Sequence, residues 1–583
     1  MWSIIFLVTF YITSSYCDEP TALWHWTCNY GKCIKMRTDP KISDLALNLE
    51  ACKMICTKFG LLWPRPRGEV KLDDVLSKVS LKRLRVVNIK RGFSDSLINK
   101  AVDRFKNLIR QSIPGKVRPK GTGSSVVIYL FNNNPDTTAI SLTMNESYSL
   151  NVRATSKDHI NVTVTGDSFF GLRHGLETLS QLFVYNDISD HVLLTRDVTI
   201  NDSPVYPFRG LLLDTARHFY PVASIKRTID AMAVVKMNTF HWHITDSQSF
   251  PFESTRRPNL TKLGTDSPAK TYSVSDMKEI VQYALERGVR VLPEFDAPAH
   301  VGEGWQDSNL LMCFKAEPWY KYCNGPPCGQ LNPIKEELYQ YLEDIYMDMA
   351  DVFDPDIFHM GGDEVNEDCW MTSPDIQQFM IKTQFSFLKL WHFFQKKAQK
   401  IAYKAFGTGT QLILWTSKLT DSSTIEKYLS KNEYIIQVWD AKDNPLIKTL
   451  LKKGYRLILT NYDALYLDCG YGAWIGGGLN WCAPYIPWQQ VYDFSPAKVA
   501  GDYKKLVIGA EAALWSEQTD AGMLDGRVWP RVAALAERLW AEPSGWRQAE
   551  RRMEHVRERL VRMGVQAETL KPEWCYQNEG FCH

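Results

Sequence analysis

The stretch Ile357-Phe358-His359-Met360-Gly361-Gly362-Asp363-Glu364 decides which fold this chain adopts. A short apolar run ends in two glycines, which indicates a buried strand whose end lies close to other backbone. Two adjacent carboxyl groups follow at once. Because neighbouring carboxylates repel, we expect the pKa values of Asp363 and Glu364 to separate, with one group held as an acid and the other as an anion. A capping or ion-pairing Asp-Glu on a surface loop is the alternative for this dipeptide taken alone.

Seven further runs in the second part of the chain share this pattern of a short apolar segment that ends in polar or aromatic residues. Helical patterns lie between many of them. Eight buried strands that alternate with helices predict an α/β fold, a (β/α)8 TIM barrel with insertions over residues 206–583. An open doubly wound sheet is the alternative, but no Gly-rich phosphate loop follows an early strand. The seven runs are Gly210–Asp214, Thr239–Asp246, Val289–Asp296, Leu412–Thr416, Tyr434–Asp440, Tyr455–Asn461 and Val507–Trp515.

The chain before the barrel divides into two predicted segments. Residues 1–17 resemble a secretory signal peptide, with an apolar core and small residues before a cut ahead of Asp18. Residues 18–205 combine a Cys-rich start with a smaller α+β domain, which ends at the turn-rich segment 201–207. No later stretch reaches eighteen apolar residues, so we expect no membrane span. The sequence thus predicts an exported, extracellular protein, with the lysosome as a second possible destination.

The cysteines support an oxidising compartment. Of 13 cysteines, Cys17 falls in the predicted signal peptide, and the others form four clusters. We predict six disulfides with local pairing inside each cluster, foremost Cys323–Cys328 and Cys575–Cys582. A zinc site that includes Cys52 and Cys56 is the alternative, although histidine partners at suitable spacing are missing elsewhere. Four sequons predict N-glycosylation in an exported protein, at Asn145, Asn161, Asn201 and Asn259.

Composition narrows the choice of ligand. The formal net charge of the 583 residues is +2, which argues against nucleic acid or an anionic membrane surface as a partner. The chain holds 19 Trp, 26 Tyr and 26 Phe. Many of these will be core residues, but an excess of indoles also suits stacking on the apolar faces of sugar rings.

The predicted strand ends carry acids and indoles. In TIM barrels chemistry lies at the carboxyl ends of the strands. An acidic pocket lined by tryptophans suits a neutral polyhydroxyl substrate. Carboxylates accept hydrogen bonds from hydroxyl groups, and indole rings stack on the apolar faces of sugar rings. The set has no clear metal-binding trio and no Ser-His-Asp order, so we predict neither a metal nor a cofactor. These residues are Asp246, Asp296, His300, Asp363, Glu364, Trp415, Trp439, Asp440, Tyr466, Asp468, Trp515 and Glu517.

Three motifs carry a resemblance to a known family. The segment 359–364 resembles the signature of glycoside hydrolase family 20, the β-N-acetylhexosaminidases. So do 240–251 (FHWHITDSQSFP) and 293–300 (PEFDAPAH). The resemblance runs from about Trp24 to the C-terminus. The cysteine placement and the tail 572–580 are most similar to the insect members that degrade chitooligosaccharides.

The resemblance implies roles for the central residues. Glu364 would protonate the glycosidic oxygen and then activate water. Asp363 would hold the N–H of the substrate's 2-acetamido group, and Tyr466 would donate to its carbonyl oxygen. That oxygen would attack the anomeric carbon to give an oxazolinium, the substrate-assisted exception to catalysis by two opposed carboxylates. Asp246 and His300 resemble a relay that tunes Glu364.

The resemblance also implies a sugar pocket. Trp415, Trp439 and Trp515 would wall it, and Arg209, Asp468 and Glu517 would bind ring hydroxyls. Arg209 precedes its strand, which by itself indicates the stabilising end of the barrel, but we follow the resemblance. Trp481 would be a platform for the next sugar. The chain departs from the close insect enzymes at Asn324-Gly325, where they carry Val-Glu, which puts a preference for longer chitin fragments in doubt.

We therefore predict an exo-acting retaining β-N-acetylglucosaminidase that removes terminal non-reducing GlcNAc from chitooligosaccharides, and that forms a homodimer as relatives do. A broader hexosaminidase that acts on N-glycans or other glycoconjugates is the first alternative. A catalytically inactive sugar-binding protein and a metal-dependent barrel hydrolase are further ones. The presence of Asp363, Glu364 and Tyr466 argues against the inactive protein.

Overall fold

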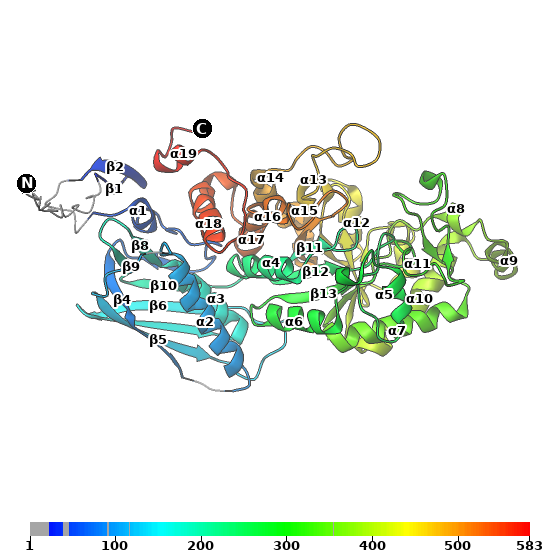
Figure 1. The fold of residues 1–583 in the computed structure, drawn as a ribbon, viewed down its shortest axis with the longest axis horizontal. Coiled ribbons are helices and arrows are strands. Elements are labelled where there is room, and N and C mark those ends of the chain that lie inside the picture. Colours follow the sequence, from blue (N-terminus) through cyan, green and yellow to red (C-terminus); the bar gives the residue numbers. More distant parts are fainter. Residues whose placement is uncertain (1–22, 39–45, 90–91, 116, 354, 583) are drawn as a thin grey trace, which may run out of the picture.

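A computed structural model describes residues 23–38, 46–89, 92–115, 117–353 and 355–582 (Figure 1). The predicted signal peptide, residues 1–17, lies outside the described residues. No helix in these ranges is long and apolar enough to cross a membrane.

The second part of the chain is a closed barrel of eight parallel strands, which confirms the predicted fold. Each predicted run overlaps one strand. The ring closes where β11 pairs with β20, Phe208 lying opposite Gly509. In order around the barrel the strands are β11 (Phe208–Asp214), β12 (Thr239–His243), β13 (Arg290–Glu294), β16 (Ile357–His359), β17 (Gln411–Trp415), β18 (Tyr434–Val438), β19 (Arg456–Leu459) and β20 (Val507–Leu514).

Amphipathic helices surround the barrel. In the helix before β13, Ser273 and Asp276 form a reciprocal capping box, and Met277, Ile280 and Ala284 lie on one buried face. This layer includes α4 (Val222–Val234), α6 (Val274–Leu285), α7 (Glu336–Phe353), α10 (Phe387–Phe406), α12 (Pro445–Lys452) and α17 (Arg531–Ala541). The other α-helices of this part of the described chain are α5 (Pro258–Leu263), α8 (Glu367–Trp370), α9 (Pro374–Thr383), α11 (Ile425–Tyr428), α13 (Tyr462–Leu465), α14 (Trp488–Asp493), α15 (Pro496–Ala500) and α16 (Leu524–Val528).

An eight-stranded mixed sheet precedes the barrel, in the order β3-β10-β6-β7-β5-β4-β9-β8. Helices α2 (Asp95–Gln111) and α3 (Phe169–Gln181) lie side by side on the sheet (Figure 1). Strand residues alternate between buried and half-buried, as expected for a sheet that packs one face against helices. The strands are β3 (Val70–Leu72), β4 (Leu76–Asn88), β5 (Ser124–Asn132), β6 (Tyr148–Ser156), β7 (His159–Gly166), β8 (Phe183–Asn186), β9 (His191–Thr195) and β10 (Val198–Asp202).

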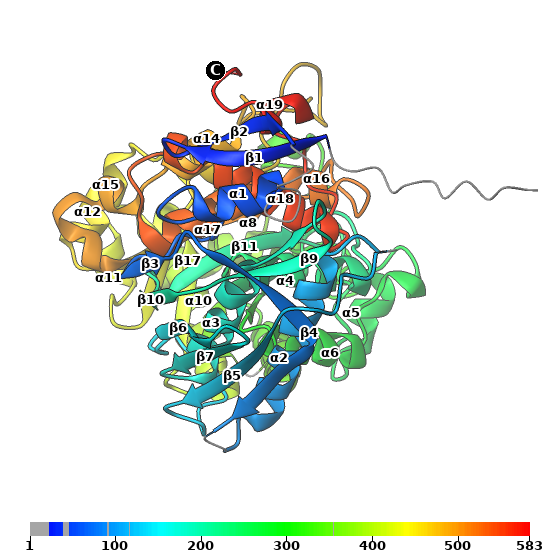
Figure 2. The same ribbon diagram turned by 90° about the vertical axis from the view of Figure 1, so that its left-hand side faces the viewer.

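The two ends of the described chain meet. A hairpin of β1 (Trp24–Asn29) and β2 (Lys32–Arg37) lies with α1 (Leu49–Ile55) beside α18 (Glu550–Arg562) and α19 (Glu573–Gln577) (Figure 2). Nζ of Lys53 is 3.5 Å from Oε2 of Glu554 across this contact.

The predicted disulfide pattern is confirmed, since every pair lies within one sequence cluster. No zinc site can form at Cys52 and Cys56, because both sulfur atoms are already bonded. The pairs are Cys28–Cys56, Cys33–Cys52, Cys313–Cys369, Cys323–Cys328, Cys469–Cys482 and Cys575–Cys582.

Candidate active site

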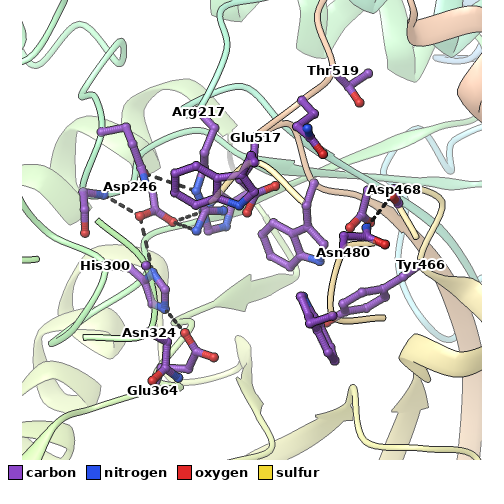
Figure 3. A pocket seen from close by; sticks show the side chains of 18 of the residues that line it. Arg217, Asp246, His300, Asn324, Glu364, Tyr466, Asp468, Asn480, Glu517 and Thr519 are labelled. Carbon is purple, nitrogen blue, oxygen red and sulfur yellow. Dashed lines mark hydrogen bonds and ion pairs between the residues drawn. The ribbon is translucent and has the colours of Figure 1, made fainter. Parts of the chain in front are cut away.

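A pocket opens at the carboxyl ends of the barrel strands (Figure 3). Segments that follow seven of the eight strands, all but β17, contribute side chains to it. Most of the predicted catalytic and binding residues meet here, although they are spread over some 270 positions between Asp246 and Glu517. The principal lining residues are Arg217, His243, Asp246, Asp296, His300, Asn324, Asp363, Glu364, Trp439, Tyr466, Asp468, Trp474, Trp481, Trp515 and Glu517.

A left-handed turn presents the two adjacent carboxyl groups. After β16 the φ angles of Gly361, Gly362 and Glu364 are +60°, +79° and +50°. A Cβ on Gly361 would lie 2.0 Å from Oδ1 of Asp296, so only glycine fits there. The backbone N–H of Gly362 donates to that same oxygen over 2.7 Å. The turn thus ends the strand early and directs Asp363 and Glu364 into the pocket.

His300 connects Asp246 with Glu364. Its Nδ1 is 3.3 Å from Oδ1 of Asp246 and its Nε2 is 3.3 Å from Oε2 of Glu364 (Figure 3). Burial disfavours the imidazolium, but the carboxylates of Asp246 and Asp296 raise the pKa of His300 well above its ordinary value. Burial opposes the anion at Glu364 too, yet its contact with His300 lowers its pKa overall. In the free pocket the proton therefore rests on His300.

The pKa values of the adjacent carboxyl groups separate. Burial, together with the charge of Glu364, raises the pKa of Asp363 to about 6. Burial and then the charge of Asp363 raise the pKa of Asp296 well above its ordinary value. The separation follows the prediction, but in the free pocket Asp363 is the weaker acid and Glu364 the anion. The predicted roles require the opposite assignment once a sugar is bound.

Four aromatic side chains form the outer wall. The rings of Trp439 and Trp481 meet edge to face with centroids 6.3 Å apart, and the centroids of Tyr466 and Trp515 are 6.1 Å apart. Nε1 of Trp439 donates to the carbonyl oxygen of Thr416 over 2.9 Å, which fixes that indole. Trp481 is 66% exposed, so it lies at the rim rather than inside the pocket.

Three polar side chains, those of Arg217, Asp468 and Glu517, lie at the base of the pocket. Burial, with the neighbouring charge of Glu517, raises the pKa of Asp468 to about 8. Nη2 of Arg217 is 2.8 Å from Oδ2 of Asp246, and the Arg217 guanidinium lies over the Trp515 ring at 5.3 Å from its centroid. These groups offer both donors and acceptors to sugar hydroxyls.

Arg217 was missed by the sequence analysis. It lies three residues after the end of β11, at Asp214-Thr215-Ala216-Arg217. The rule that chemistry follows the strand ends would have pointed to it. Arg209, which was predicted to bind the sugar, lies at the other end of the same strand.

The prediction for Arg209 is wrong. Its side chain is fully buried at the amino end of β11, where Nη2 and Nη1 lie 2.6 and 2.9 Å from the two carboxylate oxygens of Glu146. Glu146 belongs to the preceding domain, so this pair joins the two domains. A guanidinium that starts near the amino end of a strand cannot reach a pocket at the carboxyl end.

Trp415 lies one layer deeper than predicted. It is 1% exposed, and its Nε1 donates to Oε1 of Glu294 over 2.7 Å. Its ring lies 6.1 Å from that of Trp515. Trp415 therefore supports the floor from below, while Trp515 faces the cavity.

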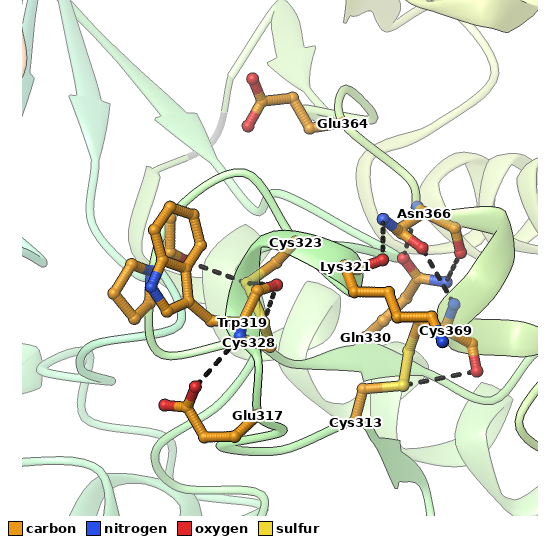
Figure 4. The surroundings of a disulfide bond; sticks show 12 residues. Cys313, Glu317, Trp319, Lys321, Cys323, Cys328, Gln330, Glu364, Asn366 and Cys369 are labelled. Carbon is orange, nitrogen blue, oxygen red and sulfur yellow. Dashed lines mark hydrogen bonds between the residues drawn. A yellow bond between two sulfur atoms is a disulfide. The ribbon is translucent and has the colours of Figure 1, made fainter.

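Disulfide Cys323–Cys328 closes a short loop beside the turn that carries Glu364 (Figure 4). The Gln330 side chain accepts from the backbone N–H of Asn366 over 2.8 Å and donates to its carbonyl oxygen over 3.0 Å. These two hydrogen bonds tie the segment after the loop to Asn366, two positions after Glu364. Asn324 lies inside the loop, and its side chain helps to lower the pKa of Glu364.

Among the described residues, two acid–histidine groups are close enough to hold a metal: His241, Glu294 and His359, and Asp246, Asp296 and His300. In both groups at least one imidazole lies between two carboxylates. The pKa of His241 rises to about 9, because Glu511 and Glu294 outweigh burial. A metal ligand must be deprotonated, so these donor sets fit protonated histidines better than a cation.

Together the barrel and an acidic, indole-lined pocket at its carboxyl end define a carbohydrate-cleaving hydrolase. Residues 206–543 match the family model for the "glycosyl hydrolase family 20, catalytic domain", and residues 62–182 match that for "beta-acetyl hexosaminidase like". The chain belongs to glycoside hydrolase family 20, which confirms the predicted resemblance.

Similar proteins come from insects and bacteria. A chitooligosaccharidolytic β-N-acetylglucosaminidase of Ostrinia furnacalis is 61% identical over 595 residues, covering 100% of both chains. A protein of the same name from Bombyx mori is 60% identical over 579 residues, or 97% of each chain. Among solved structures, a chitobiase of Flavobacterium johnsoniae has a TM-score of 0.70 at 28% identity, over 87% of this chain and 73% of that one.

Proposed function

We propose that this hydrolase is an exo-acting retaining β-N-acetylglucosaminidase that removes terminal non-reducing GlcNAc from chitooligosaccharides by substrate-assisted catalysis. The observation that carries the proposal is that Asp363 and Glu364 are consecutive residues on one turn and that both line the pocket. A retaining glycosidase with its own nucleophile needs carboxyl groups on both sides of the scissile bond. Two neighbours on one turn suit a mechanism in which the sugar's acetamide is the nucleophile.

In the first step the acetamide oxygen attacks the anomeric carbon while the bond to the aglycone oxygen breaks. The proton of Glu364 passes to that leaving oxygen. Asp363, as an anion, accepts the acetamide N–H, and the Tyr466 hydroxyl donates to the acetamide oxygen. In the second step Glu364 takes a proton from water, which attacks the anomeric carbon and opens the oxazolinium. Two inversions at this carbon give overall retention.

Bound sugar reverses the protonation pattern of the free pocket. An acetamide N–H against Asp363 favours its anion, and a glycosidic oxygen against Glu364 favours its acid. The proton of the His300 imidazolium then moves from Nε2 to Glu364, across the 3.3 Å contact. The bond between Nδ1 and Asp246 keeps the other ring proton in place, so that Nε2 is the nitrogen that exchanges.

The layout of the pocket supports exo cleavage. Arg217, Asp468 and Glu517 form the polar base and would bind the hydroxyls of the terminal sugar. Trp481 at the exposed rim would stack on the next sugar, with the remaining chain in solvent. Chitooligosaccharides as substrates are supported by the names of the two insect relatives.

Broader hexosaminidase activity is the second candidate, because Asn324-Gly325 offers neither a carboxylate nor an apolar side chain beside the aglycone. Comparing kcat/KM on chitobiose with that on a GlcNAc-terminated N-glycan separates the two. A ratio well above one supports the chitooligosaccharide substrate, and a ratio below one favours the glycoconjugate substrate.

The decisive assay is release of nitrophenol from the β-GlcNAc glycoside. We expect Glu364→Gln and Asp363→Asn each to lose about 10²–10⁴-fold in kcat. Tyr466→Phe should lose less, because it removes one donor and no charge. Equal rates on the glycoside without its N-acetyl group, or a covalent sugar adduct on either carboxylate, would refute the mechanism.

We further propose that the protein is exported, glycosylated and homodimeric. Asn145, Asn201 and Asn259 are exposed, while Asn161 is half-buried in β7. Treatment of protein secreted from insect cells with an N-glycosidase should lower its apparent mass. Light scattering on the deglycosylated protein should give twice the chain mass, and the monomer mass would refute the dimer.

A further inference from the structure

A line of buried acids and histidines continues from the catalytic site into the barrel. Oδ2 of Asp246 is 2.9 Å from Nε2 of His243, whose Nδ1 is 2.5 Å from Oε2 of Glu294. His243 and Glu294 are register partners on the neighbouring strands β12 and β13. Each of these three side chains belongs to a residue at most 3% exposed. The contact is therefore built into the barrel and does not depend on a flexible loop.

Glu294 is held from several strands at once. Its Oε1 accepts from Nε1 of Trp415 over 2.7 Å and lies 3.1 Å from Nδ1 of His359. Its Oε2 is also 3.2 Å from Nε2 of His241. Donors from β12 and β17 thus fix both carboxylate oxygens, and with them the ring plane of His243.

The two contacts of His243 require a charged ring. A neutral imidazole has one N–H, whereas His243 has a carboxylate at hydrogen-bond distance from each nitrogen. Burial disfavours the cation, but Glu294 and Asp246 raise the pKa of His243 well above its ordinary value. The charged groups that face His243 or its partners are Glu294, Asp246, Arg217, Asp296, His300 and His241.

Charge therefore alternates along one connected line. Glu294 is an anion, His243 a cation, Asp246 an anion, His300 a cation and Glu364 an anion in the free pocket. The Asp246 charge is shared between His243, His300 and Arg217. A change of charge at His243 must alter how strongly Asp246 holds the proton of His300.

We propose that His243 and Glu294 are positioning residues that act through Asp246 and His300 to set the acid strength of Glu364. This inference rests on the proposed function. With His243 in place, Asp246 orients His300 but holds its proton less tightly, so the proton can move to Glu364. Without that cation more of the Asp246 charge acts on His300 and Glu364, and Glu364 becomes a weaker acid.

The test compares two leaving groups in His243→Gln. Dinitrophenolate leaves without a proton, whereas the sugar leaving group of chitobiose needs one. We expect kcat/KM to fall at least about 30-fold on chitobiose and less than about fivefold on the dinitrophenyl glycoside. Because a buried cation is lost, the alkaline limb of kcat/KM should move up by about half a pH unit or more.

A merely structural role predicts a different result. Equal losses on the two substrates, or an alkaline limb that stays in place, overturn the inference. His174→Gln is the matched control. It is equally buried and 3.0 Å from a carboxylate oxygen of Glu146, but it lies in the preceding domain. It should leave both the leaving-group ratio and the alkaline limb unchanged.

Glu294→Gln provides a second variant if His243→Gln fails to fold, and the melting temperature identifies such a failure. It should show the same selective loss on chitobiose, because the ring of His243 loses its anchor; equal losses would again overturn the inference. Failure of the proposed function has a separate signature, since the wild type would then cleave neither substrate.

Discussion

Nη2 of Arg217 lies 2.8 Å from Oδ2 of Asp246, while Arg209, eight positions earlier on the same strand and loop, is bound to Glu146 in the other domain. The two arginines stand at opposite ends of β11. One contributes to the substrate pocket and the other to the junction between domains. Two substitutions of the same kind should therefore have different consequences.

Arg217→Met should impair catalysis more than stability. We expect kcat/KM to fall about 10²–10³-fold, largely through KM, because a charged partner of the sugar is removed. Asp246 keeps its contacts with His243 and His300, so the melting temperature should change little. Steady-state kinetics and calorimetry on the same preparation test this. Unchanged KM would contradict a role in sugar binding.

Arg209→Met should do the reverse. It leaves the Glu146 carboxylate buried without its main partner, which costs about 3–5 kcal/mol. The melting temperature should fall while KM stays constant. Adding Glu146→Leu should restore most of the stability, because an apolar pair replaces a buried ion pair at little cost. A raised KM without any loss of stability would instead indicate that Arg209 takes part in sugar binding.

Asp363→Asn should stabilise the free enzyme at neutral pH. The folded pKa of Asp363 is about 6, above its unfolded value of about 3.9. A group with a raised folded pKa contributes stability below about pH 4 and loses it as the pH rises through 6. The cost at pH 7.5 is on the order of 2–3 kcal/mol, which the amide avoids. Calorimetry should show a higher melting temperature for the variant at pH 7.5 and no gain at pH 4.

Glu364→Gln is the control for this effect, because contact with His300 lowers the pKa of Glu364. A group with a lowered folded pKa contributes stability above its unfolded pKa, and this substitution removes that contribution. The melting temperature at pH 7.5 should therefore fall. Shifts of the same sign in the two variants would contradict the separation of the pair.

Asn324→Val with Gly325→Glu should favour chitin fragments. A Cβ on Gly325 would meet the Trp474 ring at 3.6 Å, an ordinary contact, so the larger side chain fits. The new carboxylate would accept hydrogen bonds from the second sugar. We expect KM for chitotriose to fall about three- to tenfold, with little change on the nitrophenyl glycoside. Equal changes on both substrates would show that the loop acts on Glu364 rather than on the aglycone.

Removing disulfide Cys469–Cys482 should weaken aglycone binding. It closes the loop that carries Trp474, and Trp481 lies next to Cys482. The Asn480 side chain donates to the carbonyl oxygen of Asp468 over 2.9 Å, which ties the loop to the sugar site. In Cys469→Ser/Cys482→Ser we expect KM for chitobiose to rise several-fold. Cys575→Ser/Cys582→Ser is the control, with kinetics unchanged.

Much of the fold could be predicted because its signals are local. Each barrel strand is a short apolar run with polar or turn-forming residues on both sides. The run at 357–364 also contains the glycines that its turn requires. The disulfides could be grouped because each joins cysteines of one sequence cluster. Strand ends were less well predicted, because buried apolar residues such as Met360 continue past the last residue of the strand.

The sequence by itself determined the barrel, the adjacent pair Asp363-Glu364 and the family, since these depend on periodicity and on residues that are neighbours in the chain. Only the tertiary structure decided that Arg217 rather than Arg209 serves the pocket, and that His243 and Glu294 stand behind Asp246. It also decided which of the two carboxyl groups is the weaker acid in the free enzyme. The physical reason is that the reach of a long side chain and the pKa of a buried group depend on neighbours from other strands and on exclusion of water, and neither is written in the spacing of residues along one chain.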